Sequence, residues 1–272
     1  MNLNRPSVIL LFVCFFMYTK VYSQQELVDL KPKFVTVTNL HVAEGFDFEK
    51  WEAVEKEYLD KVTNNIDLII RHEVLVSYFS RGLKEIKVIN VFNSWEDIHY
   101  VNQVRDSIIE KTWPNENERA LFFEKQNSFY SNYHSDEIYL SSNWLKNISG
   151  SDKNSNKNPL VYYIDTNILA DNDNEASYDL YTQYVNEVIN KNPFIKAYLT
   201  HRHYWGADSR EFVEVFVVES LTDLEKALNK NMELLKLHEP DEVKRENFLN
   251  TFQLAVAGHK EGVYVNVPSL SK

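Results

Sequence analysis

The sequence predicts an α+β protein built from two tandem copies of one βαββαβ unit, each with an extra helix. Two observations support this prediction. The halves align without a gap at an offset of 126 residues, and 16 positions between 34 and 122 match their partners, where chance gives roughly six. The same order of strand-like and helix-like patterns also occurs twice. We therefore infer a duplication, with a first repeat at 33–145, a polar linker at 146–158 and a second repeat at 159–268.

Each repeat begins with a strand and then a helix. The segments 34–42 and 160–168 are rich in β-branched and aromatic residues, which is typical of strands. Apolar residues then recur at three- and four-residue steps, as Trp51, Val54 and Tyr58 do in the first copy. This spacing places them on one face of a helix.

A β-hairpin follows in each copy. Alternating patterns predict paired strands over 72–80 and 84–93, and again over 198–205 and 210–219. In the second copy we expect residues 206–209 to form the turn.

Capping signals mark the start of the next helix. Ser94 with Asp97, and Ser220 with Asp223, match the capping box, in which a hydroxyl and a carboxylate satisfy the free N–H groups of the first turn. A second helix is therefore expected after each serine.

A third helix is expected after Pro114 and after Pro240, and short strands at 137–141 and 262–267 close the two repeats. This order is the ferredoxin-like plan, a four-stranded antiparallel sheet with helices on one face. Two such sheets in one chain can cover each other's open faces.

In its element order and its duplication the chain resembles the dimeric α+β barrel superfamily, which includes the antibiotic-biosynthesis-monooxygenase-like and EthD-like proteins, in a tandem fused form. The resemblance covers nearly all of 33–268 and includes no catalytic motif. It implies a pseudo-dimeric α+β barrel with an enclosed pocket, either between a sheet and its helices or between the sheets. Relatives include cofactor-free oxygenases, haem-binding enzymes, isomerases and binding proteins. A fused pair also favours a monomer, because one chain supplies both halves.

Composition and charge argue against several classes of function. The net charge of −11 disfavours nucleic acid and anionic membranes as partners. The six glycines form neither a dinucleotide-binding nor a P-loop spacing, and HExxH, GxSxG and CxxC motifs are missing. We predict no cofactor, with haem or a transition metal as the alternatives, and a small molecule as the partner.

The first 23 residues predict a cleaved signal peptide. Arg5 precedes an apolar run over 8–17, and Val21-Tyr22-Ser23 suits signal peptidase. The run is shorter than the ~20 residues of a membrane-spanning helix. Cys14, the only cysteine, lies in this run. We therefore expect a periplasmic or secreted mature protein without disulfides and without a membrane contact.

The hairpin turn determines which side chains share a face of the sheet. With a turn at 206–209, His201 lies opposite Glu214 and His203 opposite Phe212. This face would enclose the pocket, while the valines at 213, 215 and 217 would meet the helices. In the first copy the same assignment of faces would place Ile89 and Val91 on the side of the sheet that meets the helices. The expected ligand-binding residues are His203, Trp205, Phe212, Phe216, Glu73, Asn90 and Phe79.

The strongest candidate site consists of His201, His203 and Glu214. Two histidines and a carboxylate could ligate a transition metal, or either histidine could hold haem. Alternatively, Glu214 raises the pKa of His201 and the two act as catalytic residues that move a proton. The third interpretation is a cross-strand hydrogen bond that only stabilises the sheet. A one-residue shift of the turn would instead bring Arg202 into the pocket and remove the histidines.

Three functions follow from these expectations. The leading one is an exported protein that binds a small apolar or aromatic ligand in a barrel-type pocket. The second is a cofactor-independent oxygenase or isomerase that uses His201 and Glu214. The third is a structural or protein-interaction module with a filled barrel. A pocket of at least ~300 Å³ separates the first two functions from the third.

Overall fold

The structure is a computed structural model that describes residues 31–78, 85–147, 158–170 and 175–272. The predicted signal peptide, most of the predicted linker, the predicted turn between the strands 72–80 and 84–93, and the candidate Phe79 lie outside these residues. In the described part of the chain, no helix combines the length and apolar character needed to cross a bilayer.

The described residues form eight strands and six α-helices. The strands are β1 (Phe34–Val42), β2 (Arg71–Ser77), β3 (Glu85–Phe92), β4 (Tyr130–Ser141), β5 (Val161–Leu169), β6 (Ala197–Trp205), β7 (Glu211–Val218) and β8 (Val256–Asn266). The helices are α1 (Phe48–Lys61), α2 (Trp95–Thr112), α3 (Glu116–Asn127), α4 (Glu175–Tyr184), α5 (Leu221–His238) and α6 (Glu242–Ala255). Two 3₁₀ turns, η1 (Thr63–Asn65) and η4 (Pro268–Leu270), and a π-helical turn, η3 (Val185–Ile189), complete the fold.

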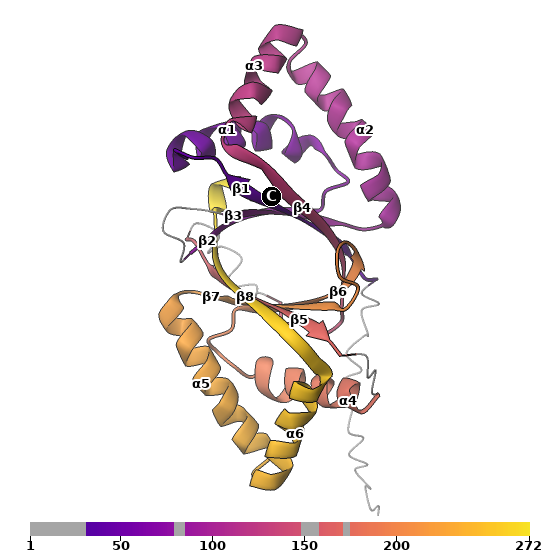
Figure 1. Ribbon diagram of the computed structural model, residues 1–272, viewed down its shortest axis with the longest axis vertical. Helices are drawn as coiled ribbons and strands as arrows, with labels where there is room; N and C mark the ends of the chain where they lie inside the picture. The colour runs from indigo at the N-terminus through magenta and orange to yellow at the C-terminus, as the bar shows by residue number, and fades with distance from the viewer. Residues whose placement is uncertain (1–30, 79–84, 148–157, 171–174) are drawn as a thin grey trace, which may run out of the picture. The chain divides into compact units, whose positions relative to one another are not determined.

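The strands close into one barrel in the order β1-β3-β2-β8-β5-β7-β6-β4, and every neighbouring pair is antiparallel. Each repeat supplies one four-stranded half, and the pairs β2–β8 and β4–β6 join the halves. Helices α1 to α3 lie outside the first half and α4 to α6 outside the second (Figure 1). The predicted pair of ferredoxin-like repeats in a pseudo-dimeric barrel is confirmed.

Both predicted capping boxes cap the helices that follow them. Ser94 accepts from the N–H of Asp97 at 3.1 Å, and the Asp97 carboxylate accepts from the N–H of Ser94 at 3.0 Å. In the second repeat Ser220 accepts from the N–H of Asp223, also at 3.1 Å. Such caps satisfy N–H groups that the helix itself leaves without partners.

Apolar side chains from both repeats fill the middle of the barrel. The buried members of this core are Val35, Leu75, Tyr139, Tyr162, Ala197, Val213, Val215, Val217 and Tyr264. Separate cores between each half-sheet and its helices contain Trp51 of α1 and Ile189 of η3, both fully buried. A buried side chain of this size stabilises the fold by about 1.5–3 kcal/mol.

The hairpin register differs from the sequence prediction by one residue. His201 pairs with Val213, and Thr200 pairs with Glu214. The turn is centred on Ala207, where the Asp208 carboxylate accepts from the N–H of Arg210 and the Asp208 carbonyl accepts from the N–H of Glu211. An odd-numbered turn replaces the expected even-numbered one, and this exchanges the two faces of β7 relative to β6.

The prediction that the valines of β7 meet the helices is therefore wrong, and so is the same prediction for Ile89 and Val91 of β3. All of these residues belong to the barrel core. The reason is steric, because valines fit the crowded interior, whereas Phe216 packs on the helix side with Val185 and Ile189.

The duplication is visible in the register itself. Arg71 pairs with Val91 in the first hairpin, and their partners at the 126-residue offset, Ala197 and Val217, pair in the second. The first strands depart from this offset by one residue. Val35 faces the barrel, and its structural counterpart there is Tyr162.

Candidate functional site

A cavity of about 620 Å³ lies between the second half-sheet and helices α4 to α6. We call it the helix-side cavity. Aromatic rings form much of its wall, and polar side chains reach it from β5 and β7. Its lining includes Trp144, Asp165, Tyr181, Phe212, Glu214, Phe216, Leu235 and Phe252. An apolar cavity with a few converging polar groups is the usual form of a small-molecule site.

Helix α4 places two tyrosines over this cavity. Tyr181 and Tyr184 are three residues apart and therefore lie on one helical face. The π-helical turn η3 follows directly, and the N–H of Asn190 bonds the carbonyl of Val185 at 2.9 Å, five residues back. Such π-turns are rare and often lie beside functional sites.

Glu214 is buried at the floor of the cavity and held by three donors. Its Oε1 accepts from the hydroxyls of Tyr181, at 2.7 Å, and of Tyr198, while its Oε2 accepts from Asn167 Nδ2 at 2.9 Å. Burial raises the pKa of Glu214, and the three hydrogen bonds partly oppose this rise. Burial and the nearby carboxylate raise the pKa of both tyrosines, so they remain neutral donors.

Asp165 lies directly opposite Glu214 on the neighbouring strand β5. Its Oδ1 is buried and has no hydrogen-bond partner. Burial, followed by the charge of Glu214, raises the pKa of Asp165 to about 6. Near neutral pH this group can therefore accept a proton or a hydrogen bond from a bound molecule, and a perturbed pKa in a cavity is typical of functional sites.

The structure separates the predicted site residues into two groups. Glu214, Phe212 and Phe216 line the helix-side cavity. His201 and His203 face the barrel interior, where His201 pairs with Val213 and His203 packs edge-on against Tyr139. The one-residue shift of the turn has placed the sheet between the histidines and Glu214 and has brought Arg202 to the cavity.

The expected catalytic pair of His201 and Glu214 is therefore wrong. Burial, and secondarily the charge of Arg71, lowers the pKa of His201 to about 4, and its Nδ1 has no hydrogen-bond partner. This is the opposite of the rise that a neighbouring carboxylate would cause.

The other predicted ligand-binding residues are scattered. Trp205 is 65% exposed at the end of β6. Asn90 lies within 2.7 Å of the Nδ1 of His72. Glu73 faces the barrel interior, where it binds Tyr162 and Arg71.

Among its described residues, the helix-side cavity offers neither a cluster of metal ligands nor a histidine for haem. Within residues 31–78, 85–147, 158–170 and 175–272, no group of three or more His, Cys, Asp or Glu side chains could hold a metal ion. Haem requires an axial ligand, and no histidine is among the described residues that line the helix-side cavity. His201 and His203 lie on the opposite face of the sheet.

Sequence reasoning missed Asp165, Asn167 and Tyr181. A signal for the first two was present, because Asp165 and Asn167 are polar residues two positions apart in a strand that is mostly apolar and aromatic. Alternation places both on one face. Tyr181 had no such signal, since a tyrosine in a helix is ordinarily a core residue.

Comparisons with solved structures reveal the same fold. A proposed monooxygenase from Fusobacterium nucleatum subsp. nucleatum has a TM-score of 0.56 at 8% identity, over 87% of this chain and 93% of its own. A proposed monooxygenase from Lactobacillus acidophilus has a TM-score of 0.51 at 10% identity, over 86% and 94%. An anthrone oxidase-like protein has a TM-score of 0.50 at 12% identity, over 88% and 92%.

The sequence matches no family model and no curated protein. The likeness to the solved structures extends over most of each chain and concerns the arrangement of strands and helices. The chain has the dimeric α+β barrel fold in its tandem fused form, with both halves of the barrel supplied by one polypeptide.

Proposed function

We propose that the helix-side cavity binds a small, largely aromatic ligand and that Asp165 receives a hydrogen bond from its polar group. The observation that best supports this is the buried Oδ1 of Asp165, which has no partner within the protein. A buried acceptor without a partner costs about 1–3 kcal/mol, and a ligand donor would recover part of that cost.

The cavity wall supports the aromatic part of the proposal. The rings of Trp144 and Tyr181 have centroids 4.6 Å apart, and Phe212 lies edge-on to Tyr181 at 5.5 Å. Aromatic rings prefer such tilted and edge-to-face arrangements, worth about 0.5–1.5 kcal/mol each beyond burial. A planar ligand can extend this array.

Calorimetric titration with 1-naphthol tests the proposal, because this probe combines an aromatic body with one hydroxyl donor. We expect saturable one-to-one binding that Asp165→Asn weakens about tenfold. Ala255→Trp, which fills the cavity, should abolish binding. Ala120→Trp, on the surface of α3, is the matched control and should leave binding unchanged. Absence of saturable binding to the unmodified chain would refute the proposal.

A second candidate function is proton transfer, with Asp165 as general base. It is favoured by the pKa of Asp165, raised to about 6, because a catalytic base is most effective when its pKa lies near the working pH. Asp165 would take a proton from an acidic carbon of the substrate, leaving an enolate, and would later return it. Two structural neighbours are described as proposed monooxygenases and a third as anthrone oxidase-like.

Deuterium exchange tests this second candidate. Anthrone in deuterated buffer should exchange the acidic hydrogens of its CH₂ group faster with the protein than without it. Asp165→Asn should reduce the protein-dependent rate ~10²–10⁴-fold. The control is Tyr100→Phe, at a tyrosine of α2 that is 46% exposed and does not line the helix-side cavity. An unchanged rate in Asp165→Asn would eliminate Asp165 as the base.

We also propose that the mature protein is an exported monomer. Support comes from the apolar leader sequence and from a barrel that closes within one chain. The intact mass of the protein from its own host, measured under native conditions, tests both points, since cleavage after Ser23 and a dimer each give a distinct mass.

A further inference from the structure

A second cavity, of about 980 Å³, opens at one end of the barrel. We call it the barrel-end cavity. Residues of β2, β5, β6 and β7 form its wall, among them Arg71, Glu73, Tyr162, Leu199 and Val217. The described residues that line it and those that line the helix-side cavity are two separate sets. The two cavities are therefore independent sites.

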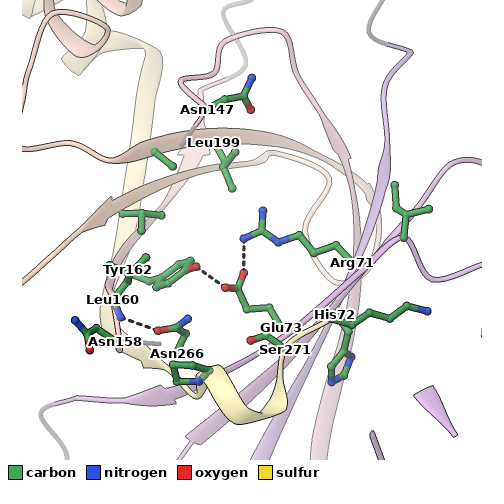
Figure 2. Close-up of a pocket in the computed structure, with 15 residues that line it drawn as sticks. Arg71, His72, Glu73, Asn147, Asn158, Leu160, Tyr162, Leu199, Asn266 and Ser271 are labelled. Carbon is green, nitrogen blue, oxygen red and sulfur yellow. Dashed lines mark hydrogen bonds and ion pairs between the residues drawn. The ribbon is translucent and has the colours of Figure 1, made fainter. Parts of the chain in front are cut away.

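Part of the polar lining of this cavity is a chain of three hydrogen-bonded side chains (Figure 2). Arg71 Nη2 donates to Glu73 Oε2 at 2.9 Å, and the hydroxyl of Tyr162 donates to Glu73 Oε1. Both carboxylate oxygens of Glu73 are thus engaged, and this side chain is 11% exposed, whereas that of Arg71 is 44% exposed. Within this chain of side chains, the charged group more open to the cavity is the guanidinium. Lys272 also lines the cavity, and its Nζ donates to the carbonyls of Thr63 and Ile66.

The opposite wall is apolar, and the duplication shows how it differs. The 126-residue offset that relates the two hairpins matches Arg71 with Ala197 and Glu73 with Leu199. All four residues line the cavity. One repeat therefore carries an ion pair where the other carries two apolar side chains, and the cavity has one charged and one apolar wall.

The next inward-facing residue after Leu199 is His201, which cannot supply a balancing negative charge. Burial, with the charge of Arg71 as a smaller cause, lowers its pKa to about 4, so the ring is neutral at physiological pH. The guanidinium of Arg71 carries five N–H groups in a planar fork. Those that do not bond to Glu73 can donate to a ligand.

We propose that the barrel-end cavity is a second ligand site, which binds a small organic carboxylate through Arg71 and its apolar body against Leu199 and Val217. A planar carboxylate matches the guanidinium fork. A phosphate dianion is disfavoured, because the carboxylate of Glu73 adjoins the guanidinium. Binding at this site involves no chemical reaction and no residue of the helix-side cavity.

Sodium octanoate is the probe, with 1-octanol as its uncharged counterpart. Titration of the full chain, followed by NMR of methyl groups, should show saturable binding of octanoate that shifts Leu199 and Val217. Leu228 and Leu249, which line the helix-side cavity, should not shift. Octanol should bind at least tenfold more weakly, because a hydrogen bond to a charged group is lost.

Variants in each wall locate the site. Arg71→Gln should weaken octanoate binding at least tenfold, whereas Arg202→Gln, which removes a guanidinium from the helix-side cavity, should leave it within twofold. Leu199→Trp narrows the cavity at its apolar wall and leaves the ion pair in place. It should weaken octanoate binding, and it therefore tests the site even if Arg71→Gln impairs folding. The proposal is overturned if octanoate does not saturate, if it shifts only Leu228 and Leu249, or if both wall variants bind it as tightly as the unmodified chain does.

Discussion

Asp165 and Glu214 lie side by side on the neighbouring strands β5 and β7, so one cavity wall holds two carboxyl groups as a cross-strand pair. Their surroundings differ. Glu214 accepts three hydrogen bonds, whereas the Oδ1 of Asp165 accepts none. Two nearby carboxylates repel each other and favour retention of a proton on one of them. Asp165 is the member that remains available to a ligand.

The first prediction concerns Asp165→Asn. The pKa of Asp165 is raised from 3.8 to about 6, so the folded state holds the proton more tightly than the unfolded state does. Stability therefore falls as the pH rises from about 4 through 6, and it stays reduced above that range. The substitution removes this loss. We expect thermal denaturation to show a higher Tm than that of the unmodified chain at pH 7.5 and a similar Tm at pH 4.

The matched control is Asp106→Asn on the exposed surface of α2. It should leave the difference in Tm between the two pH values unchanged. A gain in stability at pH 7.5 combined with weaker ligand binding is the expected trade-off at a functional site. If Asp165→Asn lowers Tm equally at both pH values, the carboxylate has a structural partner and is not held ready for a ligand.

The second prediction concerns Tyr181→Phe, which removes one of the three donors to Glu214. A hydrogen bond to a buried charged group contributes about 1.5–3 kcal/mol, so the free energy of unfolding should fall by roughly that amount. The pKa of Glu214 should rise further, because its ionised form loses a donor. Urea denaturation and carboxyl-carbon NMR measure the two effects. Tyr178→Phe, at an exposed tyrosine, should change neither.

The third prediction concerns His201→Leu. The 126-residue offset matches His201 with Leu75, a fully buried core residue, so leucine is compatible with this environment. Burial lowers the pKa of His201 from 6.5 to about 4, and the unfolded chain therefore binds the proton first as the pH falls. The histidine costs stability progressively between pH 6.5 and 4.

We expect His201→Leu to reduce the loss of stability between pH 7 and 4, measured by urea denaturation at several pH values. Binding of 1-naphthol should remain unchanged, because the sheet separates this residue from the helix-side cavity. A large loss of naphthol affinity would instead restore the histidine to the ligand site.

The order of the elements was predictable from sequence, because it depends on local signals that occur twice. The capping boxes at Ser94 and Ser220 and the strand at 34–42 match the structure closely. The closing strands β4 and β8 are longer than predicted, starting at Tyr130 and Val256. Their early residues are polar and exposed, so local composition gives no strand signal there. Pairing with β1 and β5 determines their length.

The site was only partly predictable, because it depends on whether one hairpin turn has an even or an odd number of residues. Phe212, Glu214 and Phe216 were correctly placed on one face of β7, but the residues opposite them were not. The residues Gly206, Ala207, Asp208 and Ser209 permit a turn with either an even or an odd number of residues. The Asp208 side chain closes the odd-numbered turn by accepting from the N–H of Arg210. Only the packing of the valines inside the barrel resolves this choice.

The final prediction concerns Gly206, which begins the same turn with a φ of +147°, a conformation that other residues rarely adopt. A Cβ built there would lie 1.4 Å from Glu137 Oε2. In Gly206→Ala the Glu137 side chain must rotate away, and its 3.1 Å hydrogen bond from the N–H of Ala207 is lost. Backbone strain costs about 1–3 kcal/mol, and the lost bond adds about 1 kcal/mol.

Gly45→Ala separates these two costs. Gly45 also has a positive φ, +77°, but a Cβ added there would meet no atom within 4 Å, so only backbone strain applies. Urea denaturation should therefore show a larger loss for Gly206→Ala than for Gly45→Ala. In a Glu137→Ala background the clash and the hydrogen bond are already absent, so the cost of Gly206→Ala should fall to that of backbone strain alone. Equal costs in both backgrounds would mean that Glu137 does not hold the turn.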